Sequence, residues 1–261
     1  MNLDLSGKNA LVCGSSKGIG KAAAIELAQL GANITLVARS ATILTELTRQ
    51  LARDKQQHHD FLQLDFTDSA DLRRKIKTLC SNKTIHILVN NTGGPPPGPI
   101  LEAAIEDFQQ AIHNHLYCSH ILVKAVVAGM RKDGYGRIIN IISTSVKAPL
   151  DGLGVSNTVR AAMANWSKTL ANELGPDGIT VNNVLPGFTN TQRLQQIISR
   201  KAKTQGLSEA EVIATMKQSV PLRRFADPAE VGAAVAFLAS PAAAYITGTQ
   251  ITVDGGRTRS L

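Results

Sequence analysis

The sequence predicts an α/β fold in which a doubly wound sheet of about seven parallel strands is covered by helices on both faces. Short apolar segments recur along the chain, and most are separated by stretches with helical periodicity. Segment 137–142 is apolar almost throughout, as expected of a central strand buried on both faces. The chain has 261 residues, of which 43% are hydrophobic, so we expect one large core and a single domain over residues 1–261.

Seven segments have the length and composition of strands. In chain order they are 9–12, 33–38, 61–65, 85–90, 137–142, 180–185 and 250–253. A Gly-Ala turn precedes the second segment and a Pro-Gly turn follows the sixth, which marks their ends. We expect the first helix at 21–30 and two long, largely apolar helices at 103–130 and 155–174.

Segment 188–220 interrupts this alternation and is rich in Gln, Lys and Ser. A connection this long is usually functional or mobile. We expect it to contain helical pieces that form a substrate lid, with Arg193 and Arg200 placed to meet an acidic group. The alternative is an ordinary surface insertion, which long loops tolerate.

Composition restricts the partners. The formal net charge is +8, but the basic residues are scattered and no aromatic residues are interleaved with them, so we expect no nucleic-acid partner. The charge would still attract an anionic cofactor or an acidic carrier protein. No apolar run reaches membrane-spanning length and the N-terminal residues are polar, so we expect no membrane contact and a cytoplasmic location. The three cysteines are widely spaced, which favours reduced thiols over disulfides or a metal site.

A glycine-rich loop separates the first expected strand from the first helix. Its glycines are spaced Gly-x-x-x-Gly-x-Gly and its other members are small or basic. Small residues here let the backbone approach a pyrophosphate, and the following helix N-terminus faces the phosphate charge. The loop therefore predicts a dinucleotide site of Rossmann type, formed by Gly14, Ser16, Lys17, Gly18, Ile19 and Gly20.

The end of the second expected strand distinguishes the two nicotinamide cofactors. An acidic residue there would bind the ribose 2′-hydroxyl of NAD, but the chain has Arg39 followed by Ser40. The guanidinium of Arg39 is suited to a phosphate, and Lys17 adds a second cation nearby. We therefore expect NADP(H). The alternative is that both are solvent-exposed charges with no ligand.

Further motifs follow the later strands in a fixed order: Asp65, Asn90-Asn91-Thr92-Gly93, Asn140-Ile141-Ile142-Ser143, Pro186-Gly187, and Thr247-Gly248 with Asp254-Gly255-Gly256. This set resembles the short-chain dehydrogenase/reductase family over nearly the whole chain, in particular 3-oxoacyl-carrier-protein reductases and related NADPH-dependent carbonyl reductases. The resemblance implies that Asp65 and Phe66 flank the adenine and that Asn91 and Gly93 lie at its ribose. It also implies that Pro186, Gly187 and Thr189 lie at the nicotinamide end.

The family's catalytic residues are an asparagine, a serine, and a tyrosine and lysine four residues apart. Ser143 matches the serine, but the tyrosine and lysine positions hold Ser156 and Arg160. Counting from Phe108 places His115 at the asparagine position, with Asn114 one residue away. A serine hydroxyl is a poor proton donor and arginine does not exchange protons near neutral pH. His115 is the best alternative proton donor, since histidine titrates near neutral pH; alternatively it is an ordinary helix residue.

Three functions fit this pattern. The first is an NADPH-dependent oxidoreductase with an atypical site, acting on a carbonyl or alcohol substrate, a 3-oxoacyl thioester being one candidate. The second is a catalytically silent NADP-binding sensor or scaffold, and the third is non-redox lyase chemistry on the same fold. The resemblance also implies a homo-oligomer, a tetramer or dimer, formed through the helices expected at 103–130 and 155–174.

Overall fold

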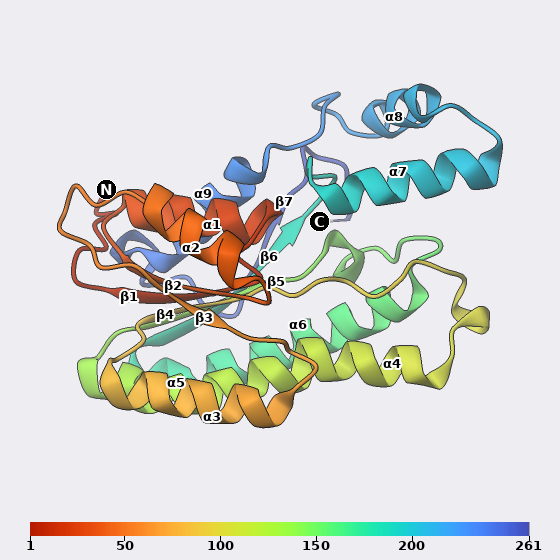
Figure 1. Ribbon diagram of the computed structural model, residues 1–261. Helices are drawn as coiled ribbons and strands as arrows, with labels where there is room; N and C mark the ends of the chain where they lie inside the picture. Colours follow the sequence, from red (N-terminus) through yellow and green to blue (C-terminus); the bar gives the residue numbers. More distant parts are fainter. Residues whose placement is uncertain (261) are drawn as a thin grey trace.

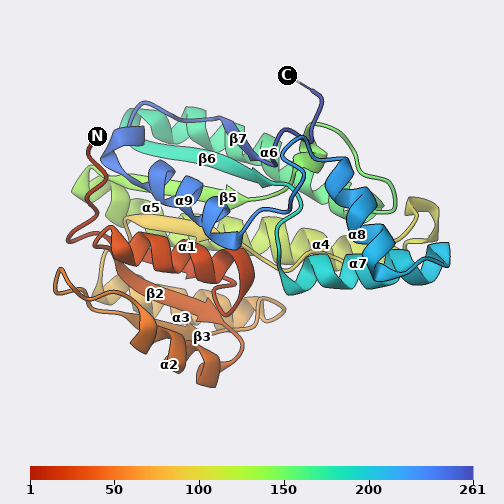
Figure 2. The same ribbon diagram turned by 90° about the horizontal axis from the view of Figure 1, so that it is seen from above.

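The computed structural model describes residues 1–260 and contains one sheet of seven parallel strands in the order β3-β2-β1-β4-β5-β6-β7 (Figures 1 and 2). The predicted α/β sheet is confirmed. Its strands are β1 (Asn9–Cys13), β2 (Asn33–Ala38), β3 (Asp60–Gln63), β4 (Ile87–Asn90), β5 (Gly136–Ile141), β6 (Ile179–Pro186) and β7 (Gln250–Val253). The strand order reverses between β1 and β4, and the carboxyl ends of parallel strands at such a point form the usual ligand crevice.

Helices cover both faces of the sheet (Figure 1). On one face lie α1 (Gly18–Gln29), α2 (Ala41–Gln50) and α9 (Pro228–Ala239). On the other face lie α3 (Ser69–Asn82), α4 (Ile105–Ile112), α5 (Cys118–Asp133) and α6 (Gly154–Leu174). The helices that cover the sheet bury apolar side chains against it, so the central strands β1, β4, β5 and β6 are buried on both faces, as their composition predicts, while the edge strands β3 and β7 are only partly buried.

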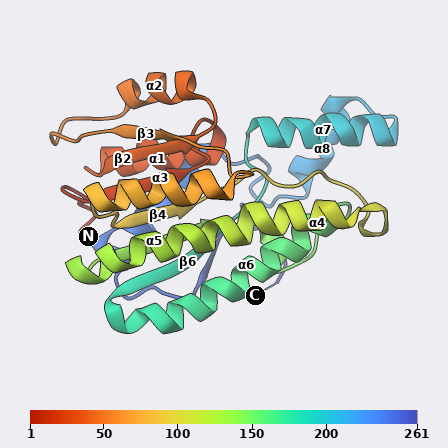
Figure 3. The same cartoon turned by 60° about the horizontal axis from the view of Figure 1, so that its bottom comes forward.

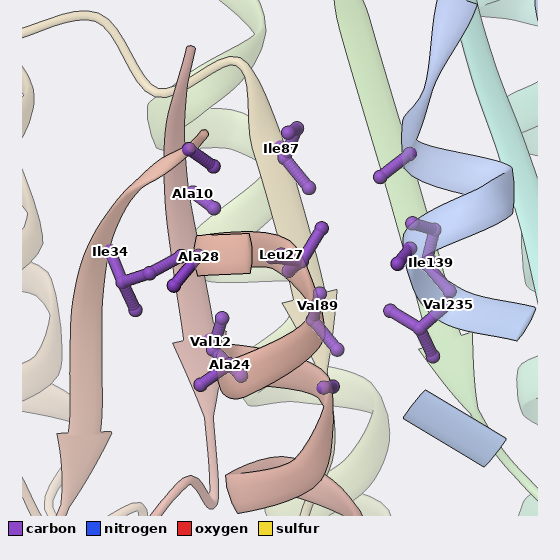
Figure 4. Close-up of a cluster of buried hydrophobic side chains, with 14 of the residues drawn as sticks. Ala10, Val12, Ala24, Leu27, Ala28, Ile34, Ile87, Val89, Ile139 and Val235 are labelled. Atoms are coloured by element: carbon purple, nitrogen blue, oxygen red, sulfur yellow. The ribbon is translucent and has the colours of Figure 1, made fainter. Parts of the chain in front are cut away.

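The core on the α1 and α9 face has small residues between the two helices. Ala24 and Ala28 pack on β1, and Leu27 lies above β4 (Figure 4). A Cβ atom on Gly232 of α9 would lie 3.0 Å from the Ala22 backbone, so a larger residue there would push the helices apart. This close packing holds the start of α1 above the end of β1, which is the position of the glycine-rich loop.

Helix 103–130 of the sequence prediction differs from the structure. The helix begins at Ile105, where the Asp107 carboxylate accepts a hydrogen bond from the Ala104 amide. A π-helical turn, His113–Tyr117, then separates α4 from α5. Such a turn inserts one extra residue and rotates the register of the side chains that follow, and it often occurs at functional sites. No helical periodicity in the sequence signals it.

Segment 188–220 forms two helices, α7 (Gln192–Gln205) and α8 (Glu209–Gln218), which project beyond the carboxyl ends of the strands (Figures 1 and 2). The predicted helical pieces are confirmed. Thr191 caps α7 and Ser208 caps α8 through side-chain oxygens. The segment that joins β4 to α4 passes between α7 and α4 (Figure 3). Within residues 1–260, no helix combines the length and hydropathy required to span a bilayer.

Candidate active site

Three positions of the glycine-rich loop, Gly14, Gly18 and Gly20, have a backbone conformation or close neighbours that favour glycine. Gly14 has a φ of +59° and Gly18 a φ of +56°, which favour residues without a Cβ atom. A Cβ on Gly14 would lie 2.6 Å from the Asn91 carbonyl oxygen, and one on Gly20 would lie 2.3 Å from the Gly14 carbonyl oxygen. The Asn91 side-chain amide donates hydrogen bonds of 3.3 Å to the carbonyls of Cys13 and Gly14. The ends of β1 and β4 are therefore joined at the start of α1.

The remaining loop residues connect this cradle to its surroundings. Ser16 is half-buried, Ile19 packs against the core, and Lys17 is exposed. The Lys17 ammonium donates a hydrogen bond to the Gln192 side chain at the start of α7. The methyl group of Thr191 lies 3.2 Å from the position of a Cβ on Gly18, so α7 begins directly over the loop.

A free cation lies at the end of β2. Arg39 is exposed and, within residues 1–260, forms no salt bridge. Ser40 next to it caps α2 by accepting a hydrogen bond from the Ile43 amide. A hydrogen bond from the Thr67 amide lowers the pKa of Asp65, and the charge of Arg39 lowers it further. Arg39 and Asp65 therefore carry opposite charges at the same edge of the sheet.

The other expected contacts also lie at the carboxyl ends of the strands. The Phe66 carbonyl contacts His113 Nε2 at 3.1 Å, while Gly93 is exposed with open space around it. Gly187 follows β6, and a Cβ there would lie 2.6 Å from the Asp254 Cβ, which explains a glycine after Pro186. Thr189 is buried and donates a hydrogen bond of 3.3 Å to the Gly187 carbonyl.

Ser143 lies just beyond the end of β5. Its backbone is extended and its Oγ accepts a hydrogen bond of 3.1 Å from the Ser145 amide. No hydrogen-bond acceptor for the Ser143 hydroxyl occurs within the described chain. The serine is half-buried, so this hydroxyl proton is available to a ligand in the crevice.

Ser156 and Arg160 lie one turn apart on α6, in the register that the sequence predicts. Ser156 is half-buried. Arg160 is only 9% exposed, and its Nη1 donates a hydrogen bond of 2.8 Å to the Ile141 carbonyl at the end of β5. Burial, together with the nearby charge of Arg193, lowers the pKa of Arg160 to about 10, so the side chain is still a cation at neutral pH.

His115 comes from the π-helical turn and is only 3% exposed. Its Nδ1 shares a hydrogen bond with the Thr92 hydroxyl, and its Nε2 is buried with no partner among residues 1–260. Burial, with the Arg160 charge adding to it, holds the pKa of His115 well below its usual range. The imidazole is therefore neutral, with one donor and one acceptor nitrogen, and the expectation that His115 titrates near neutral pH is wrong because the side chain is buried beside a cation. Asn114, by contrast, accepts a hydrogen bond from Gln110 on the exposed side.

Two contacts of this site could not be predicted from the sequence. Thr92, noted only as part of the Asn-Asn-Thr-Gly motif, binds His115 across the gap between β4 and the π-helical turn. Arg193 reaches the vicinity of Arg160 and donates a hydrogen bond of 2.6 Å to the Pro95 carbonyl. Arg200, expected to meet an acidic group with it, donates instead to the Pro97 carbonyl. The contacts of Thr92 with His115 and of Arg193 with Pro95 depend on how the helices α4, α6 and α7 are arranged around the segment that joins β4 to α4.

A glycine loop after β1, polar side chains at the ends of β4 to β6 and a serine after β5 define a nucleotide-dependent enzyme fold. In a comparison with protein families, residues 14–258 match the family described as Enoyl-(Acyl carrier protein) reductase. The chain therefore belongs to this family of short-chain dehydrogenases/reductases, as its motifs predict.

Similar proteins cover the whole chain. NADPH-dependent reductase BacG of Bacillus subtilis is 31% identical over 98% of this chain and 100% of its own length. 3-oxoacyl-[acyl-carrier-protein] reductase FabG of Vibrio harveyi is 34% identical over 97% of this chain and 98% of its own. The crystal structure of L-sorbose reductase from Gluconobacter frateurii, complexed with NADPH and L-sorbose, is 33% identical, with a TM-score of 0.93 over 100% of both chains.

Proposed function

We propose that this protein is an NADPH-dependent oxidoreductase that interconverts a carbonyl compound and an alcohol. The observation that carries the proposal is the combination of the glycine cradle closed by Asn91 with the unpaired Arg39 at the end of β2. The cradle accommodates a pyrophosphate at the N-terminus of α1. Arg39, in place of an acidic residue, favours the ribose 2′-phosphate of NADP(H) over the hydroxyl of NAD.

Each cofactor role rests on a position in the structure. The loop from Gly14 to Gly20 binds the pyrophosphate; Arg39, Ser40 and Lys17 bind the 2′-phosphate. Asp65, Phe66, Asn91 and Gly93 would hold the adenosine, and Pro186, Gly187 and Thr189 would hold the nicotinamide. When bound, the nicotinamide supplies or accepts the hydride.

The chain's own residues bind and polarise the substrate oxygen. Ser143 donates its free hydroxyl proton as a hydrogen bond to this oxygen as negative charge develops there, an interaction that strengthens in the transition state. Arg160 contributes a buried positive charge one turn from Ser156. Ser156 shapes the pocket in the position where the family carries a tyrosine.

The proton delivered to the oxygen comes through His115. A neutral imidazole whose Nδ1 accepts from the Thr92 hydroxyl presents an N–H at Nε2. Nε2 is the buried atom without a protein partner, so it is the free end of this short chain of hydrogen bonds. As Nε2 gives up its proton, Nδ1 takes the Thr92 hydroxyl proton and the Thr92 oxygen takes one from solvent water in the same relay, so neither an imidazolate nor an alkoxide is left on the protein.

Several coarser features accompany this function. We propose that α7 and α8, within residues 188–220, act as the substrate lid of a single domain spanning residues 1–261. The chain would act as a homo-oligomer, a tetramer or dimer, through α4 to α6. The free cysteines Cys13, Cys80 and Cys118 favour a reducing, cytoplasmic compartment.

The test is a titration with NADPH and NADH followed through the fluorescence of the reduced nicotinamide, then turnover with a panel of diketones, quinones, sugar ketones and 3-oxoacyl thioesters. We expect tighter binding of NADPH and oxidation of it by at least one carbonyl. Binding without oxidation would favour the sensor or scaffold. Product formed without NADPH consumption would favour lyase chemistry.

A further inference from the structure

Two arginines with no acidic partner converge beside the proposed active site. The Nη2 atoms of Arg160 and Arg193 each lie 3.7 Å from the position that a Cβ on Gly94 would occupy. The two atoms are therefore no farther apart than twice that distance. Each guanidinium is held by one backbone carbonyl, Ile141 for Arg160 and Pro95 for Arg193.

Several exposed arginines also lack an acidic partner, so the informative comparison is with the arginines that are at least half-buried. Arg137 lies over the Tyr135 ring and Arg257 lies over the Phe188 ring. Arg160 and Arg193 have neither an acidic partner nor an aromatic one within residues 1–260. Two like charges placed together in a region of low dielectric destabilise the fold unless an anion offsets them.

The pair lies on the β5 side of the crevice, although Arg193 directly follows Thr191 and Gln192, which contact the glycine loop. Arg160 donates a hydrogen bond to the carbonyl of Ile141 at the end of β5. Ser143 follows Ile141 by two residues, so the Cα atoms of Ile141 and Ser143 are at most about 7 Å apart. Gly94 follows β4, which is the neighbour of β5. The glycine loop and Arg39 lie instead at the ends of β1 and β2.

We propose that Arg160 and Arg193 form a carboxylate site and that the substrate is a small oxo acid, whose carbonyl is held at Ser143. This inference rests on the proposed function and specifies its substrate class. A carboxylate accepts paired hydrogen bonds from guanidinium groups, and two such groups fix its orientation. An acyl thioester carries no carboxylate at its reacting end, so this site disfavours it. Arg193 comes from α7, so a bound carboxylate also links the lid to α6.

The experiment compares charged and uncharged probes in three proteins. Acetoacetate and 2-oxobutyrate are assayed against acetoacetamide and 2-oxobutyramide with saturating NADPH. The variants are Arg193→Met and, as a matched control, Arg200→Met. Both arginines lie on α7 and both bond to a proline carbonyl, Pro95 or Pro97, in the segment that joins β4 to α4, but only Arg193 lies near Arg160.

We expect Arg193→Met to raise the KM for the oxo acids about ten- to a hundredfold and to leave the KM for the amides within about threefold. Arg200→Met should change neither, since its effect would be confined to the loop. Equal KM values for acids and amides in the unmodified protein would overturn the proposal. So would an Arg193→Met variant that weakens NADPH binding but not the use of oxo acids, because the anion would then be a cofactor phosphate.

A binding measurement makes the inference independent of turnover. Malonate is titrated against malonamide in the presence of NADPH, and the melting temperature is followed. We expect malonate alone to raise it, in the unmodified protein and in Arg200→Met but not in Arg193→Met. Equal effects of malonate on all three proteins, or no effect on any, would contradict the carboxylate site. Failure of NADPH to bind would contradict the proposed function instead.

Discussion

The glycine loop after β1 and the first turns of α6 border the same crevice but tolerate change differently. In the loop, Gly14 and Gly20 are surrounded by backbone atoms at distances that exclude any other residue. On α6, Ser156 and Arg160 stand where the sequence pattern places the family's tyrosine and lysine, and the helix packs its buried face as a regular element. Nucleotide binding here depends on backbone approach, whereas the chemistry depends on side chains that can be exchanged without altering the fold.

The cations of the two regions also differ in burial. Lys17 in the loop and Arg39 after β2 are exposed, which suits charges that meet a phosphate entering from solvent. Arg160 is buried beside Arg193, and burial of the imidazole together with the Arg160 charge lowers the pKa of His115. The side of the crevice formed by α6 and the π-helical turn therefore combines a positive charge with a neutral imidazole.

The largest effect is expected for Ser143→Ala. Removing the hydroxyl that meets the developing negative charge should lower kcat about 10²- to 10³-fold, with NADPH affinity unchanged. Steady-state kinetics and NADPH titration measure the two quantities. Ser145→Ala is the control, because the Ser145 hydroxyl is buried and has no hydrogen-bond partner within residues 1–260. A Ser143→Ala variant with normal kcat would show that the oxygen is bound elsewhere.

Next is Gly14→Ala in the loop. The new Cβ would meet the Asn91 carbonyl and strain a residue of positive φ, so we expect NADPH affinity to fall about a hundredfold, or about 2.8 kcal/mol. Fluorescence titration measures it, and circular dichroism confirms that the fold is retained. Gly175→Ala, where a Cβ meets nothing within 4 Å, should bind normally. Unchanged affinity in Gly14→Ala would mean that the nucleotide does not use this cradle.

A smaller change is expected for Arg39→Asp. An acidic residue after β2 should repel the 2′-phosphate and accept the ribose hydroxyl, so the ratio of NADPH to NADH affinity should fall at least about tenfold. Arg49→Asp makes the same charge change on exposed α2 and should leave the ratio unaltered. The same titration, repeated with both nucleotides, checks this. An unaltered ratio in Arg39→Asp would remove the basis for NADP(H) specificity.

The smallest effect concerns stability and pH. The pKa of His115 in the folded protein lies below its ordinary value, so the unfolded chain binds more protons and stability falls as the pH drops below about 6.5. His115→Gln should make this loss smaller in urea unfolding at pH 7.5 and 5.5. Some loss should persist, since burial also lowers the pKa of His59 and His86. The control His120→Gln, at an exposed position, should lose as much stability between pH 7.5 and 5.5 as the unmodified protein. If His115→Gln also loses as much as the unmodified protein, the buried imidazole is not neutral.

The sequence predicted the sheet well because the central strands carry nearly continuous apolar runs and turn residues separate most strands from the helices. β2 and β7 have the predicted bounds, while β3 begins at Asp60 and ends at Gln63, earlier than its apolar pattern suggests. The glycine loop could be predicted equally well, since the residues that form it are consecutive in the sequence. The π-helical turn was not, because it changes hydrogen bonding without a distinctive residue type.

Contacts between distant segments explain the rest. The pairs Thr92 with His115 and Arg160 with Arg193 are set by where α4, α6 and α7 cross the β4 loop, and no local spacing encodes these crossings. The sequence indicated that Ser156 and Arg160 depart from the family pattern. Only the structure shows that the arginine is buried against a second cation.

The proposed function requires that hydride transfer takes place in this crevice without the tyrosine and lysine of the family. Its most direct test is incubation of the protein with NADPH deuterated at the transferable position and the carbonyl panel, followed by mass spectrometry of the products. We expect deuterium in one alcohol product and its loss in Ser143→Ala. Tight NADPH binding with no deuterium transferred to any substrate would contradict it.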